Sequence, residues 1–217
     1  MEEPLYLEPD FLWFQLFCMS GIGPKRLAAV HRELQRLNLN PETVPLNKPA
    51  FAERYPDLAR LIFRKGKAGS PEVIGQEYEF LRQQGVSIIH PGHQYYLATL
   101  LSDAERFGVS PVLFCKGRIQ LFNTSRSLAV VGSRDASDVG LKAAQQLASG
   151  LAAKHFNVVS GYTKGVDSET HLGALEAGGT TTMVLSYGIL QFKIDHRFSR
   201  FDDQNMLIVS QFYPRES

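Results

Sequence analysis

Two glycine-containing segments have the residue types and the spacing of a phosphate-binding site. The first, Gly132-Ser133-Arg134, follows the apolar run 128–131, and the second, residues 160–167, follows the apolar run 156–159. Runs of this length predict buried parallel strands. Because neighbouring parallel strands end at the same edge of a sheet, we expect the two turns to lie side by side. There, free backbone N–H groups and positive helix ends favour a bound phosphate.

Charged and aromatic side chains complete this predicted site. We expect the Arg134 guanidinium to meet a phosphate through its planar fork, and Lys164 to add a second charge. Tyr162 or Phe192 would stack on a base. The structural alternatives are a salt bridge from Arg134 to a nearby aspartate and a helix-capping role for Asp167. The candidate phosphate or DNA contacts are Gly132, Ser133, Arg134, Ser160, Gly161, Tyr162, Lys164, Gly165, Asp167, Lys193 and Arg197.

Each turn must be held by a strand before it and a helix after it. Ser137 or Asp138 is placed to cap the first helix. Its apolar positions recur at helical spacing and predict the buried face: Val139, Ala143, Leu147 and Leu151. Asp167 or Ser168 is placed to cap the second helix, which we expect to stop at Gly178. Apolar runs at 180–185 and 206–209 then predict two further strands.

The composition is that of a globular protein with a sizeable core. Of the 217 residues, 44% are hydrophobic and 21% are charged, and the formal net charge is +1. A net charge this small gives no global basic field, so a nucleic-acid site must be a local patch. Cys18 and Cys115 are the only cysteines and predict two reduced thiols rather than a metal or catalytic site.

The first part of the chain predicts a small helical domain. Residues 10–81 are mainly helical in pattern, and Gly21-Ile22-Gly23-Pro24 has the form of a helix-hairpin-helix turn. Such a turn can offer N–H groups to a phosphate, or it can be only a tight connection, which we favour. His90 and His93 flank a Pro-Gly pair without a nearby carboxylate in sequence, which indicates a turn with two surface histidines rather than a metal site.

The residue pattern of the two turns resembles that of the DprA/Smf DNA-processing family. That family reads approximately VGSR, then SGLARGID, then AH and GAL. This chain has Val131-Gly132-Ser133-Arg134, the segment 160–167, then His171 and Gly173-Ala174-Leu175 in the same order and spacing. The resemblance extends over residues 85–214. It fails in residues 186–205, where the family's L-D-x-x-Y-P stretch is absent, so Lys193 and Arg197 are candidates by charge alone.

The resemblance implies a fold, an organisation and a function. The fold is an α/β, Rossmann-like, mostly parallel sheet with flanking helices, preceded by a small all-helical, SAM or helix-hairpin-helix-like domain. The expected domains are residues 1–84 and 85–217, the second incomplete at its C-terminus. The implied function is binding of single-stranded DNA in recombination, natural transformation or defence. A RecA-type recombinase and a second copy are the implied partners of the intact protein.

An enzyme or nucleotide sensor is the alternative reading. The same superfamily contains LOG-like phosphoribohydrolases, but their P-G-G-x-G-T-x-x-E motif is absent here. Ser133 and Ser160 have no visible His–Asp partners, and His171 is expected to be packed in a helix. We therefore expect no catalysis, no cofactor and no metal. The absence of a leader pattern or a membrane-length apolar run predicts a cytoplasmic protein without membrane association.

Overall fold

The computed structural model describes residues 9–19, 21–40, 49–63, 71–201 and 203–217. Its contacts divide the chain into two compact units, residues 1–113 and 114–217. The boundary expected at 84/85 lies inside the first of these units, between the helix Pro71–Gln83 and the strand Ser87–Ile89. No helix among the described residues is both long and apolar enough to cross a membrane.

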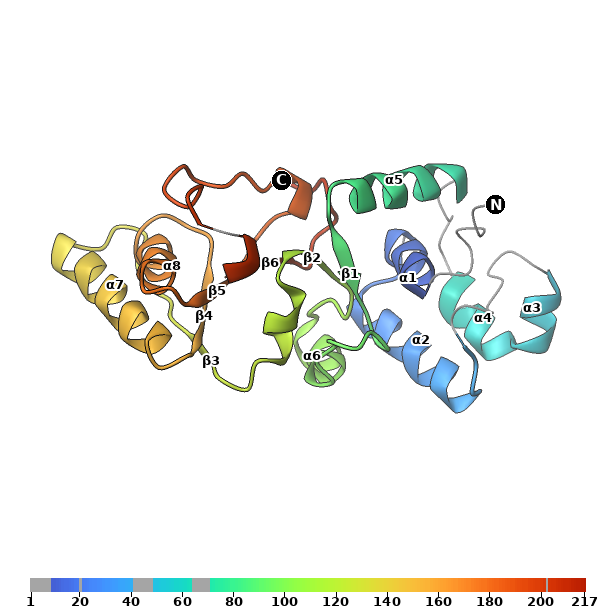
Figure 1. Ribbon diagram of the computed structural model, residues 1–217. Coiled ribbons are helices and arrows are strands. Elements are labelled where there is room, and N and C mark those ends of the chain that lie inside the picture. Colours follow the sequence, from blue (N-terminus) through green and yellow to red (C-terminus); the bar gives the residue numbers. More distant parts are fainter. Residues whose placement is uncertain (1–8, 20, 41–48, 64–70, 202) are drawn as a thin grey trace. The chain divides into compact units, whose positions relative to one another are not determined.

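Unit 1 is mainly helical, as the sequence predicts (Figure 1). The Gly23-Pro24 pair opens α2, with Gly23 as an N-cap without a side-chain bond and proline in the first turn. A buried aromatic group with Trp13, Phe14 and Tyr78 forms the centre of the unit. Its elements are α1 (Pro9–Cys18), α2 (Pro24–Arg36), α3 (Pro49–Arg54), α4 (Pro56–Phe63), α5 (Pro71–Gln83), β1 (Ser87–Ile89) and α6 (Thr99–Phe107).

Unit 2 is an α/β sheet with the strand order β2-β6-β5-β4-β3. The three pairings from β6 to β3 are parallel, and β2 runs antiparallel to β6. This confirms the expected Rossmann-like class. The elements are β2 (Leu113–Gly117), η3 (Ile119–Asn123), β3 (Ser127–Ala129), α7 (Asp138–Ala152), β4 (Asn157–Gly161), α8 (Val166–Glu176), β5 (Thr180–Val184), η4 (Ile189–Gln191), η5 (Asp203–Asn205) and β6 (Met206–Ser210).

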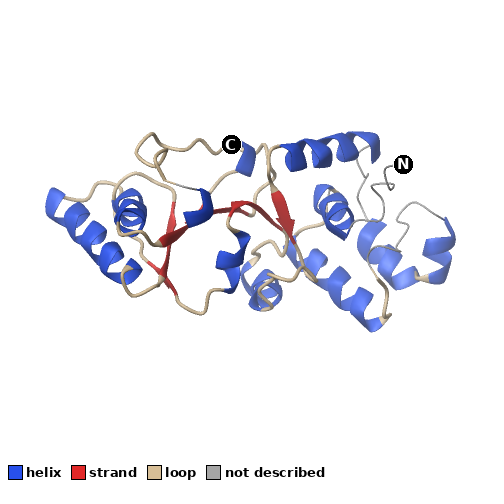
Figure 2. Cartoon of the chain, in the orientation of Figure 1, coloured by secondary structure: helices blue, strands red, loops and turns tan. Residues whose placement is uncertain are grey.

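Successive crossover units carry the two helices of unit 2. The chain runs β3–α7–β4–α8–β5 in one direction across the sheet, and Figure 2 shows this alternation of helix and strand. Right-handed connections put both helices on the same face. Helices α7 and α8 accordingly pack against each other (Figure 1). Two small residues, Ala148 and Ala174, are fully buried at this core, which allows the close approach.

Two expectations about burial are wrong. Strand β3 is exposed at every residue because it is the edge of the described sheet. On α7, two large apolar side chains of the predicted stripe face outward, with Val139 79% and Leu147 52% exposed, whereas Leu151 is partly buried against the core. The buried face instead consists of alanines: Ala144, Ala148 and Ala152.

Candidate nucleic-acid interface

The two glycine turns interlock at the carboxyl ends of β3 and β4. The Val166 N–H donates to the Ser133 carbonyl at 3.1 Å. A Cβ on Gly132 would lie 2.7 Å from Val166 Cγ1, and one on Gly165 would lie 2.7 Å from the Arg134 carbonyl oxygen. Gly165 also has a φ of 89°, which side chains other than glycine rarely adopt. Both glycines are therefore needed for the two turns to form one platform.

The buried carboxylate of Asp167 fixes the shape of the second turn. The N-cap of α8 is Gly165, without a side-chain bond, so the expected capping by Asp167 or Ser168 is wrong. Asp167 is buried, and its Oδ2 accepts a hydrogen bond from Thr163 Oγ1 at 2.6 Å. The same oxygen lies 2.7 Å from the place where a Cβ of Gly161 would be. The close fit makes glycine necessary at 161 and gives Asp167 a positioning role.

The end of strand β4 is fixed by two buried side chains. The Ser160 hydroxyl donates to the Val130 carbonyl at 2.6 Å, which ties β4 to the end of the β3 strand. His171 Nε2 lies 2.6 Å from the Gly161 carbonyl oxygen, and Nδ1 lies 2.7 Å from Thr181 Oγ1. A carbonyl oxygen only accepts, so Nε2 carries the proton of the neutral ring. Both side chains therefore hold the turn rather than face a ligand.

The buried His171 makes the stability of unit 2 depend on pH. Burial lowers its pKa from 6.5 to about 4, against opposing effects of the Gly161 hydrogen bond and Asp167. Between pH 6.5 and 4 the unfolded chain takes up a proton that the folded chain does not. The free energy of unfolding should therefore fall through this window by up to about 3 kcal/mol.

Denaturant titrations at pH 7.0 and 4.5 test this expectation on the wild type and His171→Gln. Glutamine keeps an amide donor near Gly161 but does not titrate. The wild type should lose more stability between the two pH values than the variant loses. An equal loss in both proteins would show that His171 is not the group responsible.

The backbone N–H groups of the first turn make no hydrogen bond within the described chain. Among the described residues, the N–H groups of Gly132, Ser133 and Arg134 have no acceptor, and the Arg134 guanidinium has no partner. The alternative salt bridge from Arg134 to Asp135 or Asp138 is not formed within the described part of the chain, and Asp135 pairs with Lys164 at 2.7 Å. Both side chains of that pair are largely exposed, so the pair contributes little stability. Lys164 can therefore exchange Asp135 for a phosphate at small cost.

Tyr162 is a structural residue of the loop that follows β5. Its hydroxyl accepts a hydrogen bond from the Asp195 N–H at 2.7 Å and donates to the Lys193 carbonyl at 3.3 Å. Its ring packs against Phe192 and Phe198, with centroids 5.1 and 6.0 Å away. Burial is the largest effect on its pKa and raises it. The half-buried ring thus anchors residues 192–198 beside the glycine turns.

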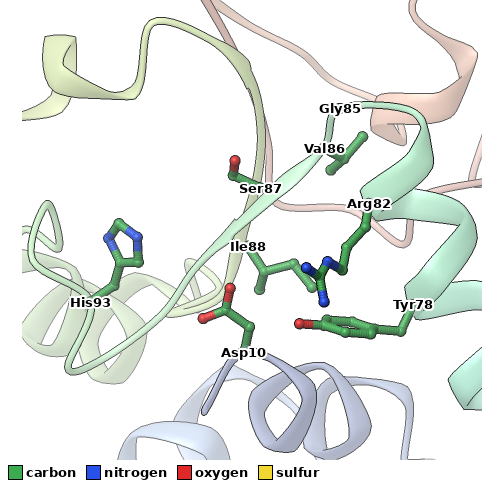
Figure 3. Close-up of a pocket in the computed structure, with 8 residues that line it drawn as sticks. All are labelled: Asp10, Tyr78, Arg82, Gly85, Val86, Ser87, Ile88 and His93. Carbon is green, nitrogen blue, oxygen red and sulfur yellow. The ribbon is translucent and has the colours of Figure 1, made fainter. Parts of the chain in front are cut away.

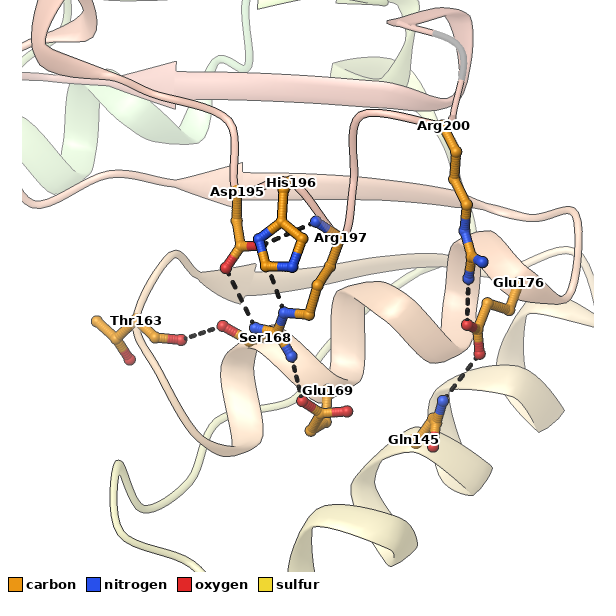
Figure 4. A network of polar contacts seen from close by, with 9 residues as sticks. All are labelled: Gln145, Thr163, Ser168, Glu169, Glu176, Asp195, His196, Arg197 and Arg200. Atoms are coloured by element: carbon orange, nitrogen blue, oxygen red, sulfur yellow. Dashed lines mark hydrogen bonds and ion pairs between the residues drawn. The ribbon is translucent and has the colours of Figure 1, made fainter.

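Ion pairs hold the same loop along helix α8 (Figure 4). Arg197 donates to Glu169 Oε1 at 2.7 Å and pairs with Asp195 at 3.4 Å. Arg200 pairs with Glu176 at 2.5 Å, and Glu176 also accepts a hydrogen bond from Gln145 of α7. The guanidinium of Arg197 is therefore occupied within the fold, in contrast to that of Arg134. Lys193 is exposed and has no side-chain partner in the described chain.

The sequence analysis did not identify the acidic residues that pair with Arg197 and Arg200. Glu169 and Glu176 lie two turns apart on α8 and face the loop, and Thr163 orients Asp167. The seven-residue spacing of the two glutamates was the available signal, since it puts both on one side of a helix. In the described ranges, no group of three or more His, Cys, Asp or Glu side chains could hold a metal ion.

The resulting platform has exposed N–H donors, and the exposed side chains of Arg134 and Lys193 add positive charge. Its buried titratable groups, Asp167 and His171, are engaged with their own turn. Such an arrangement can bind an anionic chain. A nucleophile and base in mutual contact, which hydrolysis by covalent catalysis would need, are not brought together by these residues.

Comparisons with known proteins find sequences similar to this chain in one protein family. The family model described as DNA recombination-mediator protein A matches residues 87–217. The DNA processing protein DprA of Streptococcus pneumoniae is 33% identical over 115 residues, which are 52% of this chain and 40% of that protein. A putative DNA processing protein DprA of Mycobacterium tuberculosis is 42% identical over 87 residues, 39% of this chain and 22% of that protein.

A solved structure shows the same fold. The X-ray structure of DNA processing protein A from Streptococcus pneumoniae matches with a TM-score of 0.66 at 23% sequence identity, covering 96% of this chain and 69% of that one. The matched region is less than half the length of the curated relatives. The family model, however, covers more than half of these 217 residues. The chain belongs to the family of DNA recombination-mediator protein A.

Proposed function

We propose that this chain binds single-stranded DNA through the platform of the two glycine turns, without catalysing a reaction. The observation that carries the proposal is the pair of interlocked turns with unused N–H groups at residues 132–134 beside the unpaired Arg134. Phosphates would contact these groups, Lys164 and Gly165 of the second turn, and Lys193 of the loop. Phe192, which is half-buried, is the candidate for base stacking.

The roles of the other candidate residues follow from their contacts. Ser160, Gly161 and Asp167 would support the platform from beneath, and Tyr162 and Arg197 would hold the loop that borders it. In the intact protein, the proposed setting is the cytoplasm during recombination or transformation. A RecA-type recombinase and a second copy are the proposed partners. The family's name as a recombination mediator supports this setting.

Fluorescence anisotropy with labelled oligonucleotides tests the proposal. An oligo(dT) strand should bind more tightly than a duplex of the same length, because a single strand can expose its bases to Phe192. The affinity should fall with added salt, with a shallow slope that reflects few phosphate contacts. Equal or tighter binding of the duplex would contradict single-strand recognition, and binding that is insensitive to salt would contradict the phosphate contacts.

A further inference from the structure

Asp135 and Lys164 form an ion pair between the two glycine turns. Lys164 Nζ lies 2.7 Å from Asp135 Oδ1, and the side chains of Lys164 and Asp135 are 73% and 85% exposed. Asp135 directly follows Arg134 of the first turn, and Lys164 directly precedes Gly165 of the second. The protein thus places an anion of its own at the turn to which the proposed function assigns a phosphate.

The backbone segments that carry these two side chains are fixed against each other. The Val166 N–H donates to the Ser133 carbonyl at 3.1 Å, and a Cβ on Gly165 would overlap the same carbonyl oxygen. The Asp135 N–H donates to Ser133 Oγ at 3.1 Å, which holds the main chain at the carboxylate. Formation of the pair therefore orders little more than the two side chains, so the pair can open and close while the turns stay in place.

A carboxylate paired inside the fold could not be displaced by a ligand. Asp10 pairs with His90, with 2.9 Å between Oδ1 and Nε2, and Figure 3 shows the Asp10 carboxylate projecting from α1 toward β1. The His90 ring is buried, which corrects the expected surface position, and stacks on Trp13 with ring centroids 5.8 Å apart. The side chains of Asp135 and Lys164 are instead both largely exposed, so an anion in solution can reach the ammonium.

We propose that Asp135 competes with the DNA phosphate for Lys164 and so sets the affinity and the salt dependence of single-strand binding, an inference that rests on the proposed function. When a strand binds, its phosphate takes the ammonium and the Asp135 carboxylate becomes free. An ammonium is a point charge on a flexible stem, so it can pass from one anion to the other without a change in the backbone. Lys164 therefore adds less to the affinity than an unpaired lysine would.

Asp135→Asn should bind oligo(dT) more tightly than the wild type does. The amide resembles the carboxylate in shape but carries no charge, so Lys164 becomes available to the phosphate. The strength of an exposed ion pair limits the gain in affinity to about fivefold. Asp138→Asn is the matched control and should give a clearly smaller gain, because the exposed Asp138 lies in the first turn of α7 and makes no ion pair with any described residue. Fluorescence anisotropy at one salt concentration measures both gains, and thermal melts check that the variants are folded.

The salt dependence of the affinity gives a second measurement. In the wild type, the displaced Asp135 takes up a cation while the strand releases one, so Lys164 adds little to the net release of ions. In Asp135→Asn, Lys164 acts as a further free cation, and the slope of log affinity against log salt concentration should steepen by about 0.7. Asp138→Asn should keep the slope of the wild type.

Lys164→Ala tests whether the effect of Asp135 acts through Lys164. In the Lys164→Ala background no competition is possible, so adding Asp135→Asn should change the affinity no more than Asp138→Asn does. An equal gain with and without Lys164 would show that Asp135 only repels the strand and would overturn the proposal, as would unchanged binding by Asp135→Asn. A wild type that does not bind oligo(dT) would instead contradict the proposed function, and this inference with it.

Discussion

Replacement of Gly173 by alanine is expected to destabilise unit 2 strongly. Gly173 lies in α8 where α7 crosses it, and an added Cβ would overlap the Gln145 carbonyl oxygen and lie 2.9 Å from its Cα. These are backbone atoms of a packed helix, so they can move only if the helices separate. Overpacking of this kind costs about 1–3 kcal/mol, and more where backbone must shift. Calorimetric melting should show the loss.

Gly150→Ala is the matched control. Gly150 lies inside α7, and nothing is within 4 Å of the position of its added Cβ. Alanine is preferred over glycine in a helix by about 0.5–1 kcal/mol, so this variant should melt at an equal or higher temperature. If Gly173→Ala behaved like Gly150→Ala, the close contact of α7 and α8 would be incorrect.

The close contact between α7 and α8 explains why the buried face of α7 could not be predicted. Hydrophobic periodicity identified α7, and the predicted N-cap at Ser137 is confirmed by its hydrogen bond from the Gly140 N–H. Periodicity gives weight to large side chains, however, and therefore selected the face of Val139 and Leu147. The buried face was set by the need for small residues opposite Gly173, which is a property of the pair of helices and not of one sequence segment.

Interactions between residues distant in sequence could not be predicted from local pattern. The adjacency of the two glycine turns followed from parallel strand order and is confirmed by the bond between Val166 and Ser133. By contrast, His90 was expected at the surface because its acidic partner, Asp10, is 80 residues away. Arg197 was a candidate for phosphate by charge, and Glu169, 28 residues earlier, neutralises it. Local pattern cannot identify partners at such separations.

The second large effect is expected on DNA binding. Arg134→Ala should weaken binding of single-stranded DNA about tenfold or more, because it removes a charge-assisted hydrogen bond worth about 1.5–3 kcal/mol. Arg134→Lys should recover only part of the affinity, since an ammonium cannot make the bidentate contact. The melting temperature should not change, because the exposed Arg134 side chain has no partner among the described residues.

Comparison with Arg200→Ala distinguishes the loss of a phosphate contact at Arg134 from the loss of one positive charge. It removes the same charge from unit 2, but from a loop side chain that pairs with Glu176 of α8. Its effect on affinity should be much smaller than that of Arg134→Ala when both are measured by anisotropy at one salt concentration. Equal losses would mean that only the overall field attracts DNA. Intact binding by Arg134→Ala, with a lowered melting temperature, would mean that this arginine supports the fold and that the first turn does not hold the phosphate.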